Sequence, residues 1–149
     1  MQITRVTVEF SSEPKAHPVR DALQLLDRDG SCTVRVETDD GIVGESRTYF
    51  GRVASSPGLL AAIVTEQLGP AVIGMDPFLV RDVRRRLWEL TDYQGSSGLT
   101  LFGISAIDVA LWDLMARRWT SRCGSCSERR APRSPPTRWW GGSNSTSRG

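Results

Sequence analysis

The sequence is poor in the residues that most often build catalytic or metal centres. It contains one histidine, His17, and three cysteines, Cys32, Cys123 and Cys126. An odd number of cysteines without a secretion signal argues against a disulfide framework. Cys123 and Cys126 have the C-x-x-C spacing of redox and zinc sites, but no second Cys or His pair follows to complete a tetrahedral zinc site. We therefore expect no metal site and no catalytic residue in this chain.

Long apolar runs are also missing. No stretch of 18 or more consecutive apolar residues occurs in the sequence, which argues against a membrane span. Residues 1–10 alternate polar and apolar side chains and lack the basic flank and continuous apolar stretch of a signal peptide. We therefore expect a soluble, cytoplasmic protein with no membrane partner.

A third absence divides the chain near its end. Residues 118–149 contain no valine, isoleucine or leucine, and such a segment cannot bury enough surface to offset its ordering entropy. Residues 117–149 hold eight arginines and one acid, so subtracting their +7 from the total of +2 leaves about −5 for residues 1–116. We predict a folded domain over residues 1–117 and a disordered tail rich in Arg, Pro, Ser and Gly over residues 118–149.

Alternating apolar residues predict a small sheet at the start of the chain. Residues 3–10 alternate like a half-buried strand, and residues 32–38 do so again. The sequence Asp-Asp-Gly at residues 39–41 is typical of a tight hairpin turn, and residues 42–50 supply the returning strand. Residues 11–30 carry two prolines and many polar side chains, so we expect a loop there. The prediction is a three-stranded antiparallel meander.

Helical spacing of apolar residues follows the sheet. A first helix is predicted over residues 56–68, because a Ser-Pro pair starts it and a Gly-Pro pair ends it. A second opens at residues 76–77 in the same way, and its solvent side carries arginines at positions 81, 84, 85 and 86. A third is predicted over about residues 100–117, with a buried stripe of Leu101, Ile104, Ile107, Leu111, Leu114 and Met115. A small sheet followed by three helices is an α+β fold.

Three segments together resemble a known family. Residues 36–46 read VETDDGIVGES, residues 73–77 read IGMDP, and residues 105–114 read SAIDVALWDL. The first resembles the opening hairpin of mandelate racemase and muconate lactonizing enzymes of the enolase superfamily. The second is similar to the G-x-D-P start of their second helix, and the third resembles the strongest signature of their N-terminal capping domain. The resemblance covers residues 1–117 in the family's order.

The resemblance implies a role. In that family the cap precedes a (β/α) barrel, whose acidic residues bind Mg²⁺ and whose Lys or His bases take the proton next to a substrate carboxylate. A barrel needs about 200 residues or more, so we expect it to be absent from the 32 residues that follow Arg117. The implied chemistry is racemisation, or dehydration of a hydroxy acid or acid sugar, in enzymes that are often homo-oligomers. This chain alone is expected to bind no Mg²⁺ and to be inactive.

The tail has two competing interpretations. In a reading frame displaced by one base, residues 119–128 can encode Asp-Leu-Pro-Val-Arg-Glu-Leu-Leu-Gly and residues 140–147 can encode Gly-Gly-Leu-Glu-Leu-Asp-Leu. Both resemble family sequence beyond the third helix, so our hypothesis is a one-base loss near Arg118. The alternative is a small binding protein with a basic tail, whose arginines attract the phosphates of nucleic acid and whose tryptophans stack on bases. We favour the first, because it explains the same arginines without a partner.

Four residues are candidates for a lid over a carboxylate substrate. Tyr49, Phe50 and Arg52 follow the third strand, where the family's second specificity loop lies; aromatics there can exclude water, and the guanidinium can meet a carboxylate. His17 lies in the first loop, which closes over the substrate in the family. The alternatives are core aromatics, a surface arginine and a solvated histidine. The barrel-facing surface should be apolar near the third helix and these loops, so the isolated domain is expected to self-associate or to be poorly soluble.

Overall fold

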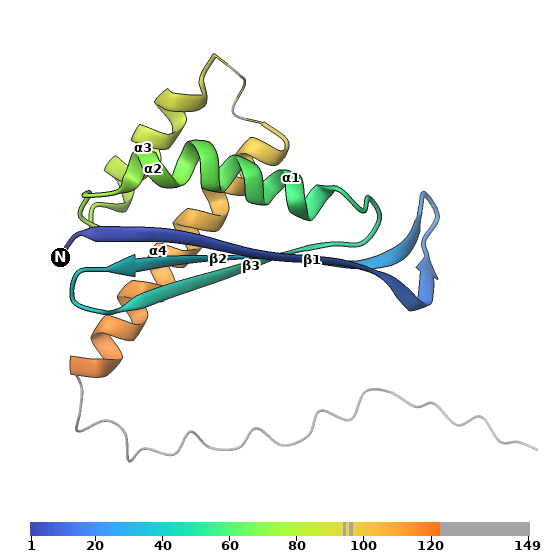
Figure 1. Cartoon of the computed structure of the whole chain (residues 1–149), viewed down its shortest axis with the longest axis horizontal. Helices are drawn as coiled ribbons and strands as arrows, with labels where there is room; N and C mark the ends of the chain where they lie inside the picture. The colour runs from blue at the N-terminus through green and yellow to red at the C-terminus, as the bar shows by residue number, and fades with distance from the viewer. Residues whose placement is uncertain (94, 96, 123–149) are drawn as a thin grey trace, which may run out of the picture.

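The structure, a computed structural model, describes residues 1–93, 95 and 97–122 (Figure 1). An antiparallel sheet in the order β1-β2-β3 is followed by helices, with an irregular π-helical segment, η1, joining α1 to α2. The prediction of an α+β fold with a three-stranded meander is confirmed. The bounds are β1 Ile3–Arg20, β2 Leu25–Thr38, β3 Val43–Phe50, α1 Ser56–Ile63, η1 Val64–Leu68, α2 Gly69–Val72, α3 Val80–Thr91 and α4 Leu99–Arg122.

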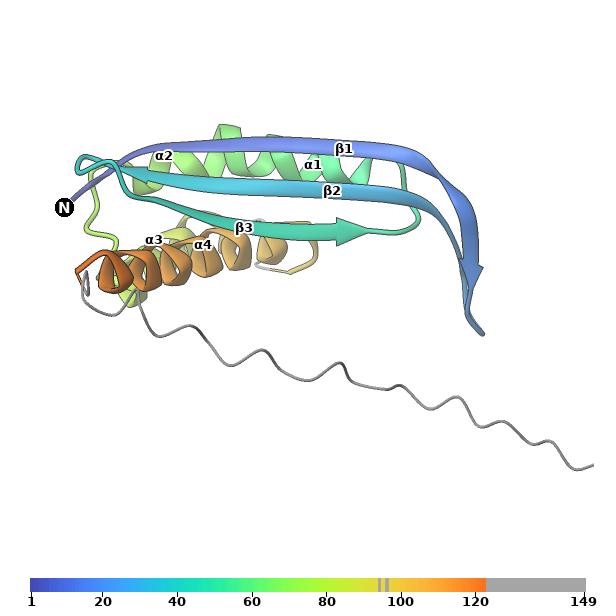
Figure 2. The same cartoon turned by 90° about the horizontal axis from the view of Figure 1, so that it is seen from below.

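The core lies between one face of the sheet and the helices. Figures 1 and 2 show α1, α2 and α4 against that face, with α3 behind α4. Every second residue of β2 points inward, as the pleat requires. The fully buried side chains that fill the space include Val34, Val36, Leu60, Val64, Leu68, Ile107, Leu111 and Leu114. A single hydrophobic core therefore holds the sheet and all the helices together.

Helix α4 rests directly on strand β3. At Gly44 the approach is so close that a Cβ atom would collide with the carbonyl oxygen of Ala110 and with Leu114. The Ser46 hydroxyl donates to the Ala106 carbonyl at 2.6 Å, and the backbone N–H of Glu45 donates to Oδ2 of Asp113 at 2.8 Å. These contacts fix the position of α4 along β3.

Residues 11–30 form a hairpin, where the sequence predicts a loop. Strands β1 and β2 stay paired from Ser11 opposite Ser31 to Pro14 opposite Arg28, and resume beyond an irregularity that ends at Val19. Pro14 is tolerated because β1 is an edge strand. The third strand ends opposite Gly30, so residues 13–29, hereafter the arm, are two-stranded. Figure 2 shows the arm extending past the end of the sheet and bending toward the side on which α4 lies.

Two helix boundaries predicted from the sequence are wrong. The first helix passes through Gly69-Pro70 and ends at Val72, because the wider π-helical turn lets the Gly69 N–H donate to the Val64 carbonyl. The second helix begins at Val80, since Asp76 forms a turn instead, its Oδ1 accepting from the N–H of Phe78 at 3.0 Å.

The third helix was predicted correctly in most of its buried stripe. Ile104, Ile107, Leu111, Leu114 and Met115 are buried, but Leu101 is 37% exposed, contrary to the prediction. The four arginines of α3 are exposed as predicted.

The last helix also continues beyond Arg117. Residues 118–122, which the sequence assigns to the tail, belong to α4, and Nη1 of Arg118 lies 3.0 Å from Oδ2 of Asp40. The predictions for Cys123, Cys126 and the rest of the tail concern residues outside the described part of the chain.

Candidate functional site

The tip of the arm is a tight turn that presents an apolar side chain. Oδ1 of Asp21 accepts from the backbone N–H groups of Leu23 and Gln24, each at 2.8 Å, and the Asp21 N–H donates to the Gln24 carbonyl at 3.0 Å. The two hydrogen bonds from backbone N–H groups lower the pKa of Asp21, because they stabilise the carboxylate. Leu23 is 94% exposed at this turn. An ordered tip therefore carries an uncovered leucine.

The stem of the arm is tied to the segment that follows β3. The N–H of Arg28 donates to the Gly51 carbonyl at 3.1 Å. The Arg28 guanidinium donates to the hydroxyl and to the carbonyl of Ser12 at 3.2 and 3.1 Å, across the hairpin. His17 is exposed and lies in the arm, between Pro14 and Val19, where the register is irregular. The structure thus joins the arm, with its His17, to the segment that carries Arg52.

The two candidate aromatics at the end of β3 point to opposite faces of the sheet. Phe50 turns toward the helices, and its ring lies 6.3 Å from that of Phe102 at an angle of 55°. Tyr49, opposite Ser31 on β2, is 74% exposed on the other face. Arg52 is exposed just beyond. Of the predicted pair, only Phe50 lies on the side of the first turn of α4.

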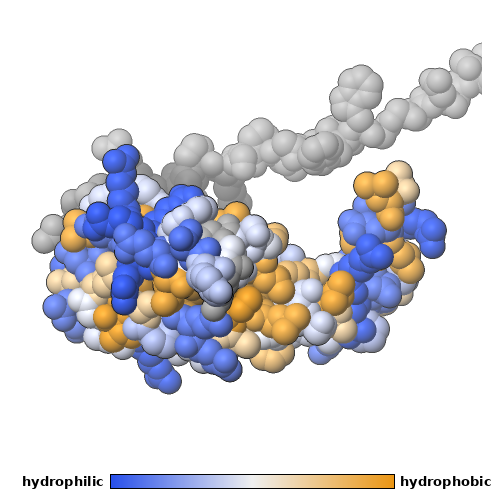
Figure 3. Space-filling view, turned by 90° about the horizontal axis from the view of Figure 1, so that it is seen from above, coloured by the Kyte–Doolittle hydropathy of each residue, from blue (hydrophilic) through white to orange (hydrophobic). Residues whose placement is uncertain are grey.

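A hollow separates the arm from the body of the domain. Figure 3 shows the arm standing apart at one end, with apolar side chains on its tip and on the body across the gap. On the body, Leu101 and Phe102 of α4 line a small pocket of about 190 Å³ together with Gly98 and Ser105, and Phe102 lies beside Phe50 at the end of β3. Sequence reasoning missed Leu23 and Phe102 as candidates. The signal for Leu23 was an apolar residue inside a segment otherwise read as a polar loop.

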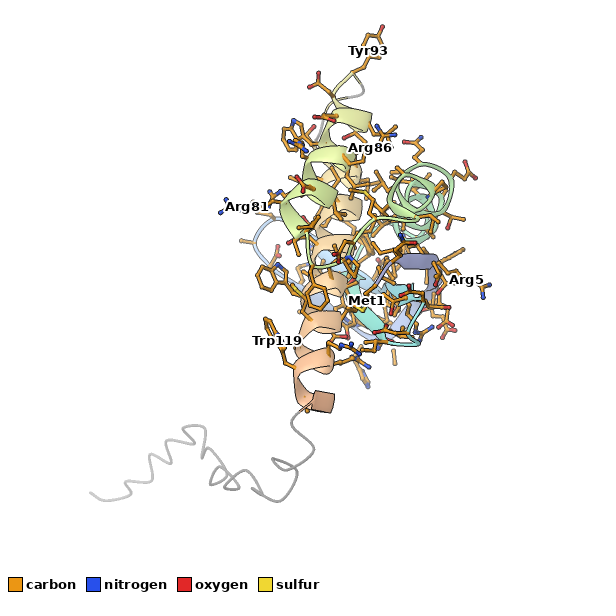
Figure 4. All side chains as sticks on the ribbon, turned by 90° about the vertical axis from the view of Figure 1, so that its left-hand side faces the viewer. Met1, Arg5, Arg81, Arg86, Tyr93 and Trp119 are labelled. Atoms are coloured by element: carbon orange, nitrogen blue, oxygen red, sulfur yellow. The ribbon has the colours of Figure 1, made fainter. Side chains whose placement is uncertain are left out.

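A second apolar surface lies on the outer side of α4. Val109, Trp112 and Trp119 are each more than half exposed. The two tryptophans line a groove of about 640 Å³ together with Phe78, Leu79, Val80, Arg81, Asp82 and Met115. In Figure 4, Trp119 and Arg81 project from the same side of the molecule, away from Arg5 on the sheet. Since a helix that is apolar all round is normally covered on every side, this face is suited to a further protein surface.

The apolar composition of α4 has an ordinary structural cause. Residues Leu99–Thr120 are long and apolar enough to cross a membrane by length and composition, and nearly half of that stretch is buried inside the domain. Its inward side chains form the hydrophobic core against β3, so we assign α4 to the core of the domain.

The described residues offer little catalytic chemistry of their own. Within residues 1–93, 95 and 97–122, no group of three or more His, Cys, Asp or Glu side chains could hold a metal ion. Cys32 is buried, and burial raises the pKa of its thiol, which makes it a poor nucleophile. What the arrangement can do is cover a ligand with the arm and present an apolar face to another domain.

Comparison with known proteins identifies similar sequences and structures. Residues 3–121 match the family described as mandelate racemase/muconate lactonizing enzyme, N-terminal domain. D-galactarolactone cycloisomerase of Agrobacterium fabrum is 31% identical over 119 residues, which are 80% of this chain and 30% of that protein. The chain therefore spans less than a third of this curated relative.

Two solved structures show the same relation. A racemase from Streptomyces coelicolor A3(2), crystallised with bound magnesium, is 28% identical with a TM-score of 0.70, covering 78% of this chain and 32% of its own. L-talarate/galactarate dehydratase from Salmonella typhimurium LT2, liganded with Mg and L-lyxarohydroxamate, is 26% identical with a TM-score of 0.69, covering 79% and 31%. The similarity thus covers most of this chain and about a third of each of these proteins.

Proposed function

Because this chain belongs to the mandelate racemase/muconate lactonizing enzyme N-terminal domain family, we propose that it is the substrate-capping domain of a Mg²⁺-dependent racemase or acid-sugar or hydroxy-acid dehydratase. The observation that carries the proposal is the match over residues 3–121 combined with an arm that overhangs one end of the domain. The residues present do not fit a Mg²⁺ site in the described part of the chain. We therefore assign the metal and the proton-transfer bases to a barrel domain.

The proposed substrate lid consists of the arm and the end of β3. Leu23 at the arm tip and Phe50 beside Phe102 would exclude water from a ligand held below them. Arg52 is the proposed partner of a substrate carboxylate, and His17 is the proposed polar contact from the arm. Tyr49 stays a candidate, on the opposite face of the sheet from Phe50.

The proposed seat of the barrel is the outer face of α4. The groove lined by Trp112 and Trp119 lies toward the end of α4, where the chains of the relatives continue beyond the matched residues. Burying these indoles would remove a large apolar area from water. Such burial stabilises an interface by about 25 cal/mol per Å² of apolar surface. Without a barrel, this exposed surface favours poor solubility or self-association. A cytoplasmic location also stays a prediction.

A direct assay tests the inactivity of the chain. The pure 149-residue protein is incubated with Mg²⁺ and a panel of hydroxy acids and acid sugars, and product is followed by chromatography. We expect no turnover above the buffer control, since neither metal ligands nor bases are assigned to this domain. Turnover that survives repurification would contradict the proposal.

A chimera tests the capping role. Residues 1–122 replace the N-terminal domain of L-talarate/galactarate dehydratase, and Mg²⁺-dependent dehydration is compared with that of the same barrel without a cap. We expect the chimera to be the more active of the two. Phe50→Ala in the chimera should raise KM several-fold, whereas Tyr49→Ala, the matched control on the opposite face, should have a smaller effect. Equal effects of the two variants would contradict the placement of the lid on the Phe50 side.

A further inference from the structure

The rim of strand β1 is an open edge of the sheet. Odd-numbered residues from Arg5 to Glu13 face odd-numbered β2 residues in the hydrogen-bonded positions, so even-numbered residues aim their backbone groups outward. Ile3, beyond a bulge, uses its outward groups to exchange hydrogen bonds with Gly74 and Met75. From Val6 to Phe10, the described residues supply no partner for these outward groups, whereas the Ser12 carbonyl accepts from the Arg28 guanidinium. Such an edge is a template for pairing with another strand.

The sequence of this edge is complementary to itself. We propose that β1 pairs antiparallel with β1 of a second copy of this chain, with Thr7 opposite the partner's Thr7, to form a six-stranded sheet across two subunits. In this register Val6 and the partner's Val8 exchange backbone hydrogen bonds, twice by symmetry. Arg5 then lies directly opposite the partner's Glu9 on the polar face, where cross-strand pairs of opposite charge are favourable.

Charge favours this register over the others that the edge allows. Sliding the strands by two residues sets Arg5 opposite the partner's Ser11 or Thr7 and loses its pairing with the partner's Glu9. Sliding the strands by four residues in one direction places Glu9 opposite the partner's Glu9, and in the other it places Arg5 opposite the partner's Arg5; like charges directly opposite are destabilising. Figure 4 shows Arg5 projecting outward at this edge. Glu9 already lies 2.7 Å from Nη1 of Arg35, but 70% of its side chain is exposed, so it has room for a second cation.

An exposed aromatic ring, Phe10, and a hollow beside the edge support the same register. Phe10 is 60% exposed on the helix side of β1. Beside the edge lies a hollow of about 260 Å³, lined by Thr4, Arg5, Val6, Thr65, Gly69, Pro70 and Ile73. With Thr7 on the two-fold axis, the partner's Phe10 falls opposite Thr4, next to this hollow, and its ring can fill it. Electrostatic and apolar complementarity thus point to one alignment.

Disulfide cross-linking tests the register. Two Thr7 residues on the axis form a non-hydrogen-bonded pair with Cα atoms about 4.5 Å apart, which suits a disulfide. In the full chain with Cys123→Ser and Cys126→Ser, Thr7→Cys should give a dimer-sized species under mild oxidation that disappears on reduction. Arg47→Cys, on the same face but on β3 at the opposite edge of the sheet, should stay monomeric.

Two results of this experiment would overturn the proposal. Thr7→Cys that stays monomeric while its circular dichroism is native rules out the alignment. Preferential cross-linking through Val109→Cys shows that copies associate through the outer face of α4, which would leave the capping proposal standing and remove this one.

Charge reversal supplies an independent test. Glu9→Arg alone or Arg5→Glu alone should reduce the yield of the Thr7→Cys cross-link about tenfold, and the double reversal should restore it, because the opposite charges meet again. Glu45→Arg is the matched control, since Glu45 is the other partner of Arg35 at 2.9 Å and lies on β3. An equal loss with Glu45→Arg, or no rescue by the double reversal, contradicts the pairing.

Discussion

Both sides of α4 carry large apolar side chains, but the surroundings of the two sides differ completely. The inner side places Ile104, Ile107 and Leu111 in the core with 1% exposure or less. The outer side leaves Val109, Trp112 and Trp119 between 53% and 60% exposed. The inner side holds this domain together, whereas the large apolar side chains of the outer side are left mostly uncovered by the described residues. The difference separates residues required for folding from residues available for assembly.

The largest expected effect comes from removing a core side chain of α4. Leu111→Ala should lower the free energy of unfolding by about 3 kcal/mol, since it removes buried methyl groups and leaves a cavity. Its neighbour Trp112→Ala, on the outer side, should change stability by about 0.5 kcal/mol or less and improve solubility. Urea denaturation followed by circular dichroism measures both. Comparable losses in the two variants would mean that the outer side is covered in solution.

Adding a side chain at Gly44, where α4 contacts β3, should have the next largest effect on stability. Gly44→Ala introduces a Cβ atom against the Ala110 carbonyl and Leu114, and such overpacking costs about 1–3 kcal/mol. Gly41→Ala is a useful control, because no atom lies within 4 Å of a Cβ there and its cost would come only from a φ of +81°. If thermal melts show Gly44→Ala to be as stable as the natural chain, the tight seat of α4 on β3 is wrong.

Asp113 lies between the two sides of α4 and links the helix to strand β3. Its Oδ2 accepts from the Glu45 N–H and from Nε of Arg117 at 2.7 Å. Asp113→Ala should cost about 1 kcal/mol, because the strand N–H loses its charged acceptor. Asp108, on the same helix, has no hydrogen-bond or ion-pair partner among the described residues, so Asp108→Ala should be close to neutral. A double-mutant cycle with Arg117→Ala separates the helix–strand bond from the salt bridge.

The smallest expected effect depends on pH. The hydrogen bond from the Thr38 hydroxyl and then the charge of Arg118 lower the pKa of Asp40 in the folded chain. A carboxyl with a lowered folded pKa stabilises the fold above its unfolded pKa and loses this contribution as the pH falls through the folded value. The difference in urea midpoint between the natural chain and Asp40→Asn should therefore be present at pH 6 and shrink below about pH 4. A difference that stays constant down to pH 3 would contradict this assignment.

The sequence predicted the presence of the strands and helices better than the places where they end. The hairpin turn was recognised because a tight turn needs a residue with a positive φ, which the glycine of Asp-Asp-Gly adopts readily. Gly41 indeed has a φ of 81°. Pro14 misled the prediction of the arm, because a proline on an edge strand costs no ladder hydrogen bond. Gly69-Pro70 misled the prediction of the helix end, because a π-helical turn accommodates the pair and the glycine packs closely against Val6.

The candidate site was only partly accessible from the sequence. Phe50, Tyr49 and Arg52 were picked as neighbours in the chain, but pleating sends Phe50 and Tyr49 to opposite faces, as the predicted strand over residues 42–50 already implied. Leu23 and Phe102 acquire their positions only through tertiary structure, the first by the length of the arm and the second by the seat of α4. Pairing along the chain is local, whereas these positions depend on long-range packing.

The turn at Asp21 bears on how the arm would close. Two hydrogen bonds to the Asp21 carboxylate and one between the backbones of Asp21 and Gln24 already fix the tip. Closure over a ligand would therefore not have to order a flexible loop and would avoid about 1–2 kcal/mol of entropy loss per residue. Any movement then belongs to the stem, where pairing is irregular between Pro14 and Val19. The arm would move as a rigid body, and the conformation around Leu23 would already be set before the ligand binds.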